Sequence, residues 1–305
     1  MNNSSPTFSV IIPTYNRAHI IARAVKSVLL QSFQNFEIIV VDDGSTDNTE
    51  NIVKSIGDER IIYFKHEKNK GQNAALNTAL LAAKGNYIAF LDSDDEWLPT
   101  MLEKQLMRYE KDTEISCVYS WAGTIKDNIL TPGMRFSLEG YIYKEALTQG
   151  YVSHMITLSA KRDCFEKIGN FDEKFVVCQD DDICLRLAEN YKFGLIAEPL
   201  AIIHSDAGNQ TITNKKNYAD GWYNLFSKYE DDIISICGNK TAALHFSKVG
   251  YLYVLANEKG KARKILLKSM KLFILLKSTL FLLVTFSPFN KLNHKIVSLI
   301  NYSLK

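Results

Sequence analysis

A group of carboxylates follows an apolar segment in the first third of the chain. Tyr87–Leu91 has the β-forming side chains of a buried strand, and Asp92-Ser-Asp-Asp95 follows it directly. Carboxylates two residues apart repel one another, and a hard divalent cation with oxygen ligands would hold Asp92 and Asp94 together and in turn neutralise a diphosphate. The alternative is structural, because Asp94 or Asp95 would also serve as the N-cap of the next helix.

Two more acids stand in the same position after an earlier strand. Phe36–Val41 is an apolar run, and Asp42 and Asp43 follow it. A carboxylate at the C-terminal end of a strand can accept hydrogen bonds from a ribose hydroxyl or a nucleobase N–H, and the alternative is a solvated turn. Asp47, with Glu50 three residues later, predicts the start of a helix.

A third acidic run, Gln179-Asp-Asp-Asp182, opens the helical stretch Ile183–Asn190. The helix dipole favours acids in a first turn, but three in a row exceed what a cap needs. A carboxylate at such a helix start suits a general base, which must stay ionised. His204 follows another predicted strand. It is a candidate ligand for the metal or the diphosphate, and a structural histidine is the alternative.

Apolar runs of strand length alternate with helical spacings, which predicts a mainly parallel sheet with right-handed crossovers and flanking helices. The carboxyl ends of parallel strands share one edge, where open α/β sheets bind ligands. The loop at 13–17 lacks the glycines of a dinucleotide fingerprint or a P-loop. The expected strands are Phe8–Ile12, Phe36–Val41, Ile61–Phe64, Tyr87–Leu91, Cys117–Trp121, Met155–Ser159 and Leu200–His204, and the expected helices are Ala18–Gln31, Gly71–Ala83, Thr100–Tyr109, Ile183–Asn190, Ala219–Cys237, Ala242–Ala256 and Gly260–Phe286.

The composition is that of a globular protein with a large core. The chain has 305 residues, 46% of them hydrophobic, and its five cysteines are scattered without a Cys-x-x-Cys pair. This pattern indicates neither a disulfide framework nor a zinc site, and a cytoplasmic location is expected. The polar N-terminus, residues 1–7, lacks the regions of a signal peptide.

The charge is divided unevenly. Residues 259–305 hold ten Lys or Arg and no Asp or Glu, so the net charge of +2 leaves −8 for residues 1–258. Basic residues interleaved with Leu, Ile and Phe predict attachment to the inner face of the cell membrane rather than binding of nucleic acid. A helical hairpin packed on the catalytic domain is the alternative. The longest uncharged run, Ser278–Asn290, has 13 residues, short of the ~20 that a spanning helix needs.

The order of these signals resembles the family-2 glycosyltransferases of the GT-A fold over about residues 7–206. The resemblance is carried by Ser9-Val-Ile-Ile-Pro-Thr-Tyr-Asn16, Val40-Val-Asp-Asp-Gly-Ser-Thr-Asp47, Leu91-Asp-Ser-Asp-Asp95, Gly169-Asn-Phe-Asp172, Asp180 and Leu185-Arg186. It implies inverting, metal-dependent transfer of a sugar from a nucleotide diphosphate sugar to a hydroxyl of a glycan or lipid-linked acceptor, in the synthesis of surface polysaccharide.

The resemblance also implies a role for each matching residue. Asp180 matches the catalytic base, and Asp94 the ligand of Mn²⁺ or Mg²⁺. The implied contacts of the nucleotide are Pro13, Tyr15, Asp42, Asp43, Asp92 and Ser93. The implied catalytic domain is residues 1–212, with a nucleotide-binding half at about 7–121 and an acceptor half at about 122–212. Residues 213–305 form a helical extension that is basic and amphipathic from about 259.

Two positions depart from the family pattern. Gln179 stands where a glutamate usually precedes the base, and Asp181 or Asp182 remains an alternative base. Ala75-Leu76-Asn77 replaces a common Ala-Arg-Asn and removes a basic side chain, for which Lys70 or Arg17 would compensate. Two other functions stay open: a membrane-associated sugar-nucleotide or glycan-binding module without catalysis, and a nucleotidyltransferase.

Overall fold

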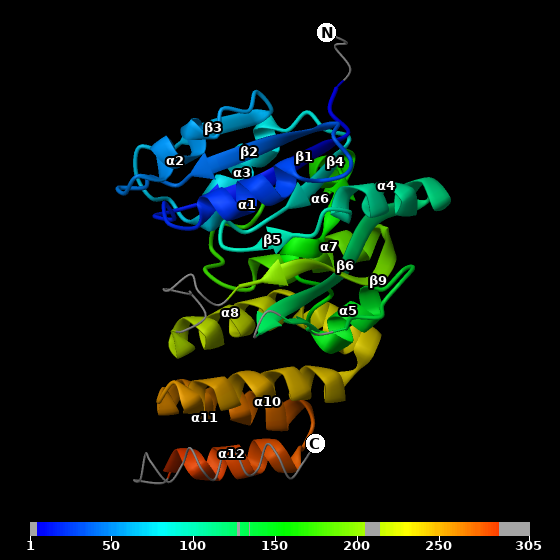
Figure 1. Ribbon diagram of the computed structural model, residues 1–305. Coiled ribbons are helices and arrows are strands. Elements are labelled where there is room, and N and C mark those ends of the chain that lie inside the picture. Colours follow the sequence, from blue (N-terminus) through cyan, green and yellow to red (C-terminus); the bar gives the residue numbers. More distant parts are fainter. Residues whose placement is uncertain (1–4, 127–128, 134, 205–213, 287–305) are drawn as a thin grey trace. The chain divides into compact units, whose positions relative to one another are not determined.

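The structure, a computed structural model, describes residues 5–126, 129–133, 135–204 and 214–286 (Figure 1). The predicted domain boundary at 212 and the last part of the predicted basic extension, 287–305, lie outside the described residues. The chain divides into two compact units. The first comprises Met1–Tyr143, Val152–Lys174 and Ile183–Gly208, and the second Lys144–Tyr151, Phe175–Asp182 and Asn209–Lys305.

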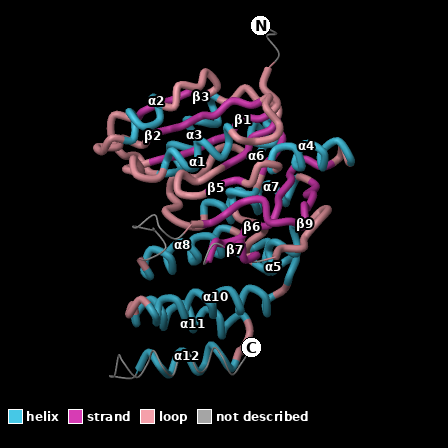
Figure 2. The backbone as a smooth tube through the Cα atoms, viewed as in Figure 1, coloured by secondary structure: helices cyan, strands magenta, loops and turns pink. Residues whose placement is uncertain are grey.

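The first unit is built on a sheet with the strand order β3-β2-β1-β4-β8-β6-β9-β5, and β7 pairs with β6 (Figure 2). Strands β3, β2, β1 and β4 are parallel, as are β6 and β9, while β8 is antiparallel to both β4 and β6. The predicted mainly parallel α/β sheet is therefore confirmed. The strands are β1 (Phe8–Thr14), β2 (Phe36–Asp42), β3 (Ile61–Lys65), β4 (Tyr87–Phe90), β5 (Glu96–Trp97), β6 (Ile115–Lys126), β7 (Ile129–Pro132), β8 (Ser159–Lys161) and β9 (Lys192–Ile203).

Helices connect the parallel strands of the first unit and cover the sheet. Strands β1, β2 and β4 are buried over most of their length, so their apolar runs must be covered on both faces. The helices are α1 (Ile21–Leu29), α2 (Thr49–Ser55), α3 (Gln72–Ala82), α4 (Met101–Lys111) and α6 (Arg162–Ile168), together with α7 (Gln179–Asn190), whose first turn belongs to the second unit, and a 3₁₀ turn at Met155–Thr157.

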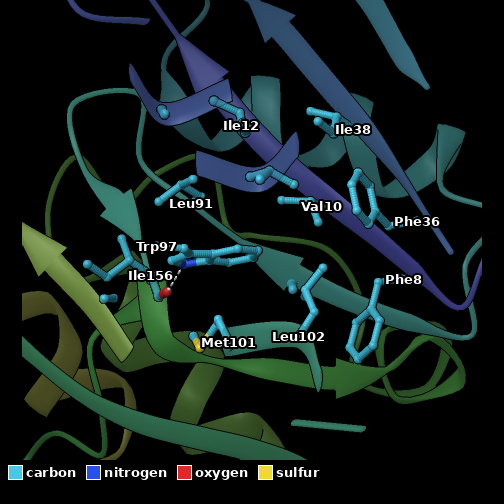
Figure 3. Close-up of a cluster of buried hydrophobic side chains, with 14 of the residues drawn as sticks. Phe8, Val10, Ile12, Phe36, Ile38, Leu91, Trp97, Met101, Leu102 and Ile156 are labelled. Carbon is cyan, nitrogen blue, oxygen red and sulfur yellow. Dashed lines mark hydrogen bonds between the residues drawn. The ribbon is translucent and has the colours of Figure 1, made fainter. Parts of the chain in front are cut away.

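The main core lies between the sheet and one layer of helices (Figure 3). Phe8, Val10 and Ile12 alternate along β1 and share one face of the sheet, as the period of two along a strand requires. They pack in the cluster that also contains Trp97, whose indole Nε1–H donates to the carbonyl oxygen of Ile156 at 2.7 Å. This bond satisfies the one polar group of a buried tryptophan. It also fixes the segment that directly follows the acidic run at 92–95.

One predicted strand was wrong. Met155–Ser159 is not a strand: residues Met155–Thr157 form the 3₁₀ turn, and β8 begins only at Ser159. The predicted strand Leu200–His204 is confirmed as far as Ile203. It is the end of the longer strand β9, which lies between β6 and β5 and therefore has partners on both sides.

The second unit is helical. Its main helices are α5 (Tyr143–Gln149), α8 (Lys215–Lys228), α9 (Glu230–Asp232), α10 (Asn239–Leu255), α11 (Lys259–Leu272) and α12 (Leu276–Phe286), with a π-helical turn at Ile233–Cys237. Helices α10 and α11 approach closely at Gly250. A Cβ atom at that position would lie only 2.6 Å from Cγ of Leu266. Among the described residues, no helix is both long enough and apolar enough to cross a membrane.

Candidate active site

The parallel strands bring most of the predicted nucleotide contacts to one edge of the sheet. Thr14 at the end of β1 pairs in register with Asp42 at the end of β2. Ile11 of β1 accepts a hydrogen bond at its carbonyl from the N–H of Leu91, just before the acidic run. The loops that follow these three strands therefore start at the same edge. The ends of the strands and these loops carry Pro13, Tyr15, Asp42, Asp43, Asp92, Ser93 and Asp94.

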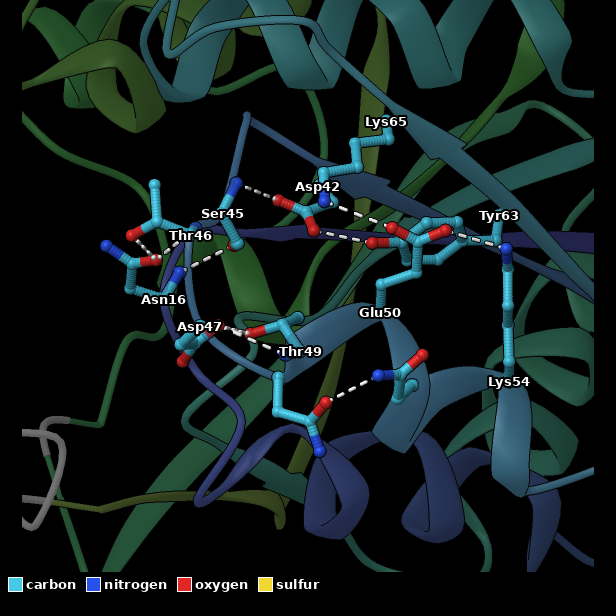
Figure 4. Close-up of polar contacts among 12 residues, drawn as sticks. Asn16, Asp42, Ser45, Thr46, Asp47, Thr49, Glu50, Lys54, Tyr63 and Lys65 are labelled. Carbon is cyan, nitrogen blue, oxygen red and sulfur yellow. Dashed lines mark hydrogen bonds and ion pairs between the residues drawn. The ribbon is translucent and has the colours of Figure 1, made fainter.

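Hydrogen bonds join the loops after β1 and β2 (Figure 4). Asn16 has a positive φ of 53°, and its N–H donates to Oγ of Ser45 at 2.7 Å while its Oδ1 accepts from the N–H of Thr46 at 2.9 Å. Asp47 joins the same network. Its Oδ2 accepts from the N–H of Ala18 at 3.0 Å, and its Oδ1 accepts from the N–H of Thr49 at 3.0 Å. A helix begins here as predicted, but α2 starts at Thr49 with Asn48 as the N-cap, and Asp47 instead fastens the two loops together.

Asp42 is fully buried and stabilises its own turn. Its Oδ1 accepts from the N–H of Ser45 at 2.7 Å, and its Oδ2 accepts from the hydroxyl of Tyr63 at 2.5 Å. Burial and the hydrogen bond to Asp42 raise the pKa of Tyr63, so the phenol stays protonated and donates. Both carboxylate oxygens of Asp42 are thus engaged within the protein.

Asp43 is also buried and organises the loop after β3. Its Oδ1 accepts from the N–H of Lys70 at 2.9 Å and contacts Nδ1 of His66 at 2.7 Å, and its Oδ2 accepts from the N–H of Gly71 at 2.7 Å. Gly44 is next to it at φ +79°, and a Cβ there would lie 2.6 Å from the carbonyl carbon of Lys68. Asp43 and Gly44 therefore hold the segment that leads into α3 close to the sheet edge.

Three carboxylates gather after β4. The oxygens of Asp92, Asp94 and Asp95 that face one another all lie within 4.8 Å. Asp95 is buried, and its pKa is raised to about 8, first by burial and then by the charge of Asp92. An arrangement of oxygen ligands this close, with one carboxyl destabilised by its neighbour's charge, is suited to a hard divalent cation.

Asp95 was missed as a site residue from the sequence. The sequence placed it at a helix start, but Glu96 and Trp97 form the short strand β5 against β9. The pairing places Asp95 next to the end of β9, where its Oδ1 accepts from the N–H of His204 at 3.0 Å. The available signal was the nearness of Asp95 to Asp92 and Asp94 in the sequence, which the expected helix cap obscured.

Arginine and histidine side chains border the three carboxylates. Arg17 places a guanidinium nitrogen 3.9 Å from Oδ2 of Asp94, and Arg23 donates to the carbonyl oxygen of Asp94 at 2.5 Å. The imidazole Nε2 of His204 lies 3.1 Å from Oε2 of Glu96. His204 thus adjoins the carboxylates through its main chain, while its ring pairs with Glu96.

Two residues of the recognised motifs fix the Gly169–Asp172 segment. Nη1 of Arg186 donates to the carbonyl oxygens of Ile168, Gly169 and Asn170 at 2.9, 3.2 and 3.0 Å. The amide of Asn77 donates to the carbonyl oxygen of Phe171 at 3.0 Å and accepts from its N–H at 2.8 Å. Asn77 is therefore a structural residue of α3.

The third acidic run lies in the second unit, at the first turn of α7. Asp180 is half-buried, and its pKa is raised to about 7, first by burial and then by the charge of Asp181. Asp182 is buried, and its Oδ1 accepts from Nζ of Lys228 at 2.5 Å and from the hydroxyl of Tyr229 at 2.9 Å. The predicted convergence of Asp180 with Asp43 and Asp94 stays a prediction.

Known proteins resemble this chain in sequence and in fold. A sequence model of the family described as "Glycosyl transferase family 2" matches residues 9–167, just over half of the chain. WcaA of Escherichia coli, a glycosyl transferase provisionally assigned to colanic acid biosynthesis, is 28% identical over 236 residues, which cover 75% of this chain and 83% of WcaA.

Two solved structures superpose on almost the whole chain. S. aureus TarS 1–349 in complex with UDP-GlcNAc has a TM-score of 0.68 at 17% identity, covering 97% of this chain and 88% of that one. The mannosyltransferase PcManGT from Pyrobaculum calidifontis, in complex with GDP-Man and Mn²⁺, has a TM-score of 0.60 at 18% identity, covering 98% of this chain and 86% of that one. Identities this low show a shared fold alone.

Proposed function

This chain belongs to glycosyl transferase family 2, and from that premise we propose that it transfers a sugar, with inversion, from a nucleotide diphosphate sugar to a hydroxyl of a glycan or lipid-linked acceptor. Its fold, shared with the two solved structures, is the GT-A fold that the motifs predicted. The observation that carries the proposal is the group of three carboxylates, Asp92, Asp94 and Asp95, beside the loops that follow β1 and β2. The proposed catalytic domain is residues 1–212.

Asp94, with Asp92 and Asp95 beside it, would hold Mn²⁺ or Mg²⁺. The donor set fits, because oxygen ligands of carboxylates are what both cations take. When bound, the cation supplies positive charge against the diphosphate as negative charge grows on it. The complex of PcManGT with GDP-Man and Mn²⁺ supports this choice. His204 remains a candidate contact at the same place, although its ring already has Glu96 as a partner.

The donor nucleotide is proposed to lie against the loops after β1 and β2. Asp43 and Asp42 would contribute mainly by fixing those loops, since their carboxylate oxygens already accept hydrogen bonds from the protein. Tyr15, which is 43% exposed, has an accessible ring next to Pro13. An exposed aromatic ring beside a rigid turn supports a stacking contact with a nucleobase.

Asp180 is proposed as the general base. Its carboxylate takes the proton from the acceptor hydroxyl, whose oxygen forms a bond to the anomeric carbon as the bond from that carbon to the diphosphate oxygen breaks. Attack from the face opposite the leaving group inverts the configuration. Asp182 is the weaker candidate because Lys228 and Tyr229 already engage its carboxylate. Gln179 is neutral and cannot supply the charge of a base.

The acceptor is proposed to be a growing surface polysaccharide or its lipid-linked precursor, as the assignment of WcaA to colanic acid biosynthesis suggests. A lipid-linked acceptor presents its hydroxyl at a membrane, and the extension offers a means of attachment. Phe273, Ile274 and Leu276, between and at the start of its last two helices, are exposed, and Lys271 and Lys277 flank them. Apolar side chains would enter the interface while lysines meet anionic headgroups.

Release of nucleotide diphosphate tests the reaction. The full chain is incubated with Mn²⁺ and a panel of donors that includes UDP-GlcNAc and GDP-Man, and the variants are Asp94→Asn and Asp180→Asn. We expect Asp180→Asn to slow release by ~10² to 10⁴, the usual contribution of a general base. Asp94→Asn should also abolish the rise in melting temperature that Mn²⁺ gives the wild type, since a ligand stabilises only the protein that binds it.

Asp231→Asn, in an exposed acid of the second unit, is the matched control and should behave as the wild type. Equal release from all four proteins would refute the assignment of base and metal ligand. Stabilisation by a nucleotide diphosphate sugar without release would instead indicate a binding module. Formation of pyrophosphate from a nucleoside triphosphate would indicate a nucleotidyltransferase.

A further inference from the structure

A lysine of the C-terminal helices, Lys228, neutralises the last of the acids that follow Asp180. Lys228, at the end of α8, places Nζ 2.5 Å from Oδ1 of Asp182 and over the rings of Phe175 and Tyr229, 5.5 Å from each centroid. The hydroxyl of Tyr229 donates to the same carboxylate oxygen. Asp182 is 1% exposed, so its charge is stabilised by these two donors rather than by water.

Asp181 lies between Asp180 and this anchored residue. Burial raises the pKa of Asp181 to about 7. Cys178, just before the run, has a positive φ of 65°, an uncommon conformation for a side-chain-bearing residue. The turn that opens α7 therefore starts from an uncommon backbone conformation and is fixed by side-chain contacts at its third acid.

Without Lys228 the acidic turn would be less stable. Asp180, Asp181 and Asp182 are consecutive, and three unpaired carboxylates would repel one another and favour either protonation or fraying of the first turn. Lys228 offsets the charge of the third acid. Asp180 then has one charged neighbour fewer, and the backbone is fixed two residues after it.

We propose that Lys228, at the end of α8, is a positioning residue for Asp180, which holds the first turn of α7 in place and limits the negative charge close to the base. This inference rests on the proposed role of Asp180. It gives the C-terminal helices a part in the transfer reaction that is independent of any attachment to membranes. The groups that contact the acidic turn within its own unit are Lys228 and Tyr229, and Cys178 and the charge of Lys248 also act on Asp181.

The test compares Lys228→Met with Lys268→Met in the full chain. Lys268 is a matched control, because its Nζ also pairs with a carboxylate, Oε2 of Glu230 at 2.5 Å, and also lies over a ring, that of Phe246 at 3.9 Å. Lys268 differs in that its carboxylate partner does not belong to the acidic turn. Nucleotide release with Mn²⁺ is measured for kcat, for the KM of the donor that the wild type turns over, and across pH.

We expect Lys228→Met to lower kcat about tenfold or more, with little change in the donor KM, as for loss of an interaction made in the transition state. Lys228→Met should also move the rise of kcat to higher pH, because Asp182 then carries an uncompensated charge two residues from Asp180. Lys228→Arg should restore most of the kcat and of the pH profile. Lys268→Met should match the wild type in kcat and in pH profile.

Equal kcat and pH profiles for Lys228→Met and Lys268→Met would overturn the inference and leave the proposed function intact, since Asp180→Asn tests the base separately. If Lys228→Met does not fold, Tyr229→Phe removes the other donor to Asp182 at little cost in volume. A pH profile and a kcat of Tyr229→Phe like those of the wild type would then count against the role of the Asp182 contacts.

Discussion

At the scale of single residues, Asp180 should determine how the rate depends on pH. Its pKa is raised to about 7 by burial and by Asp181, so a large fraction is protonated at neutral pH and cannot accept a proton. We therefore expect kcat to rise with pH and to level off above about 7. Because Asp180 and Asp181 interact, the midpoint belongs to the pair. Asp181→Asn removes one charge and should move the rise to lower pH, and a rise at unchanged pH would contradict this account.

The same carboxyl should lower stability as the pH rises. The pKa of Asp180 is 3.8 in its ordinary state and about 7 in the folded protein, so the folded state binds the extra proton between these values. The contribution of Asp180 to the free energy of unfolding is fully present below pH 3.8 and is lost as the pH rises through about 7. The loss is at most about 1.4 kcal/mol per pH unit. Urea unfolding should show Asp180→Asn more stable than the wild type at pH 8 and equal to it near pH 4. Asp231→Asn should show no such difference.

Residue types and order were enough to predict which acids follow which strand, but not what each acid does. Asp42 and Asp43 follow a strand as expected, yet both carboxylates bind protein groups, Tyr63 and the loop at 66–71. Those partners are distant in sequence and only the folded sheet brings them together. Asp95 was missed for the same reason, since its burial depends on the pairing of β5 with β9.

At the scale of elements, the loop after β2 depends on a glycine that no other residue can replace. Gly44 and Gly57 both have positive φ, at +79° and +69°, but a Cβ at Gly44 would meet the backbone of Lys68 at 2.6 Å, whereas one at Gly57 would have nothing within 4 Å. Gly57→Ala should cost only the backbone strain, ~1 to 2 kcal/mol. Gly44→Ala should cost more than ~3 kcal/mol, because strain and overlap add.

Urea denaturation of both variants measures the difference. Gly44→Ala should also weaken the binding of nucleotide diphosphate, since the overlap displaces the segment that Asp43 holds, and Gly57→Ala should not. Similar losses of stability in the two variants would mean that the loop after β3 moves aside freely.

The periodicity of the sequence predicted the elements of the parallel half well and those of the other half less well. Strands β1 to β4 and helices α1, α3 and α4 appear where apolar runs and helical spacings predicted them. Strands β1, β2 and β4 are buried over most of their length, so their apolar runs are clear in the sequence. The turn at Met155–Thr157 was mistaken for a strand because its residues are buried, and a short apolar run in the sequence fits a buried turn as well as a buried strand. The start of β9 at Lys192 was missed because polar and small residues, Lys192 and Gly194 among them, interrupt its apolar pattern.

At the scale of the whole molecule, the proposed attachment to membranes depends on exposed apolar side chains of the extension. Ile274 is 76% exposed, between α11 and α12, and the extension around it carries lysines and no acids. Leu81 on α3 is 82% exposed and lies in a part of the chain with acids and bases mixed, so it serves as a control for exposure alone.

Ile274→Asp should therefore release the protein from vesicles that contain anionic phosphatidylglycerol, by ~10-fold or more in partition, because one buried isoleucine contributes about 1.5 to 3 kcal/mol. Leu81→Asp should leave partition unchanged. Cosedimentation with such vesicles and with phosphatidylcholine alone separates the contribution of the apolar side chains from that of the lysines. Added salt should weaken only the binding that comes from the lysines. If the wild type stays in the supernatant with both kinds of vesicle, the extension is a soluble helical hairpin, and the acceptor must then reach the enzyme without its help.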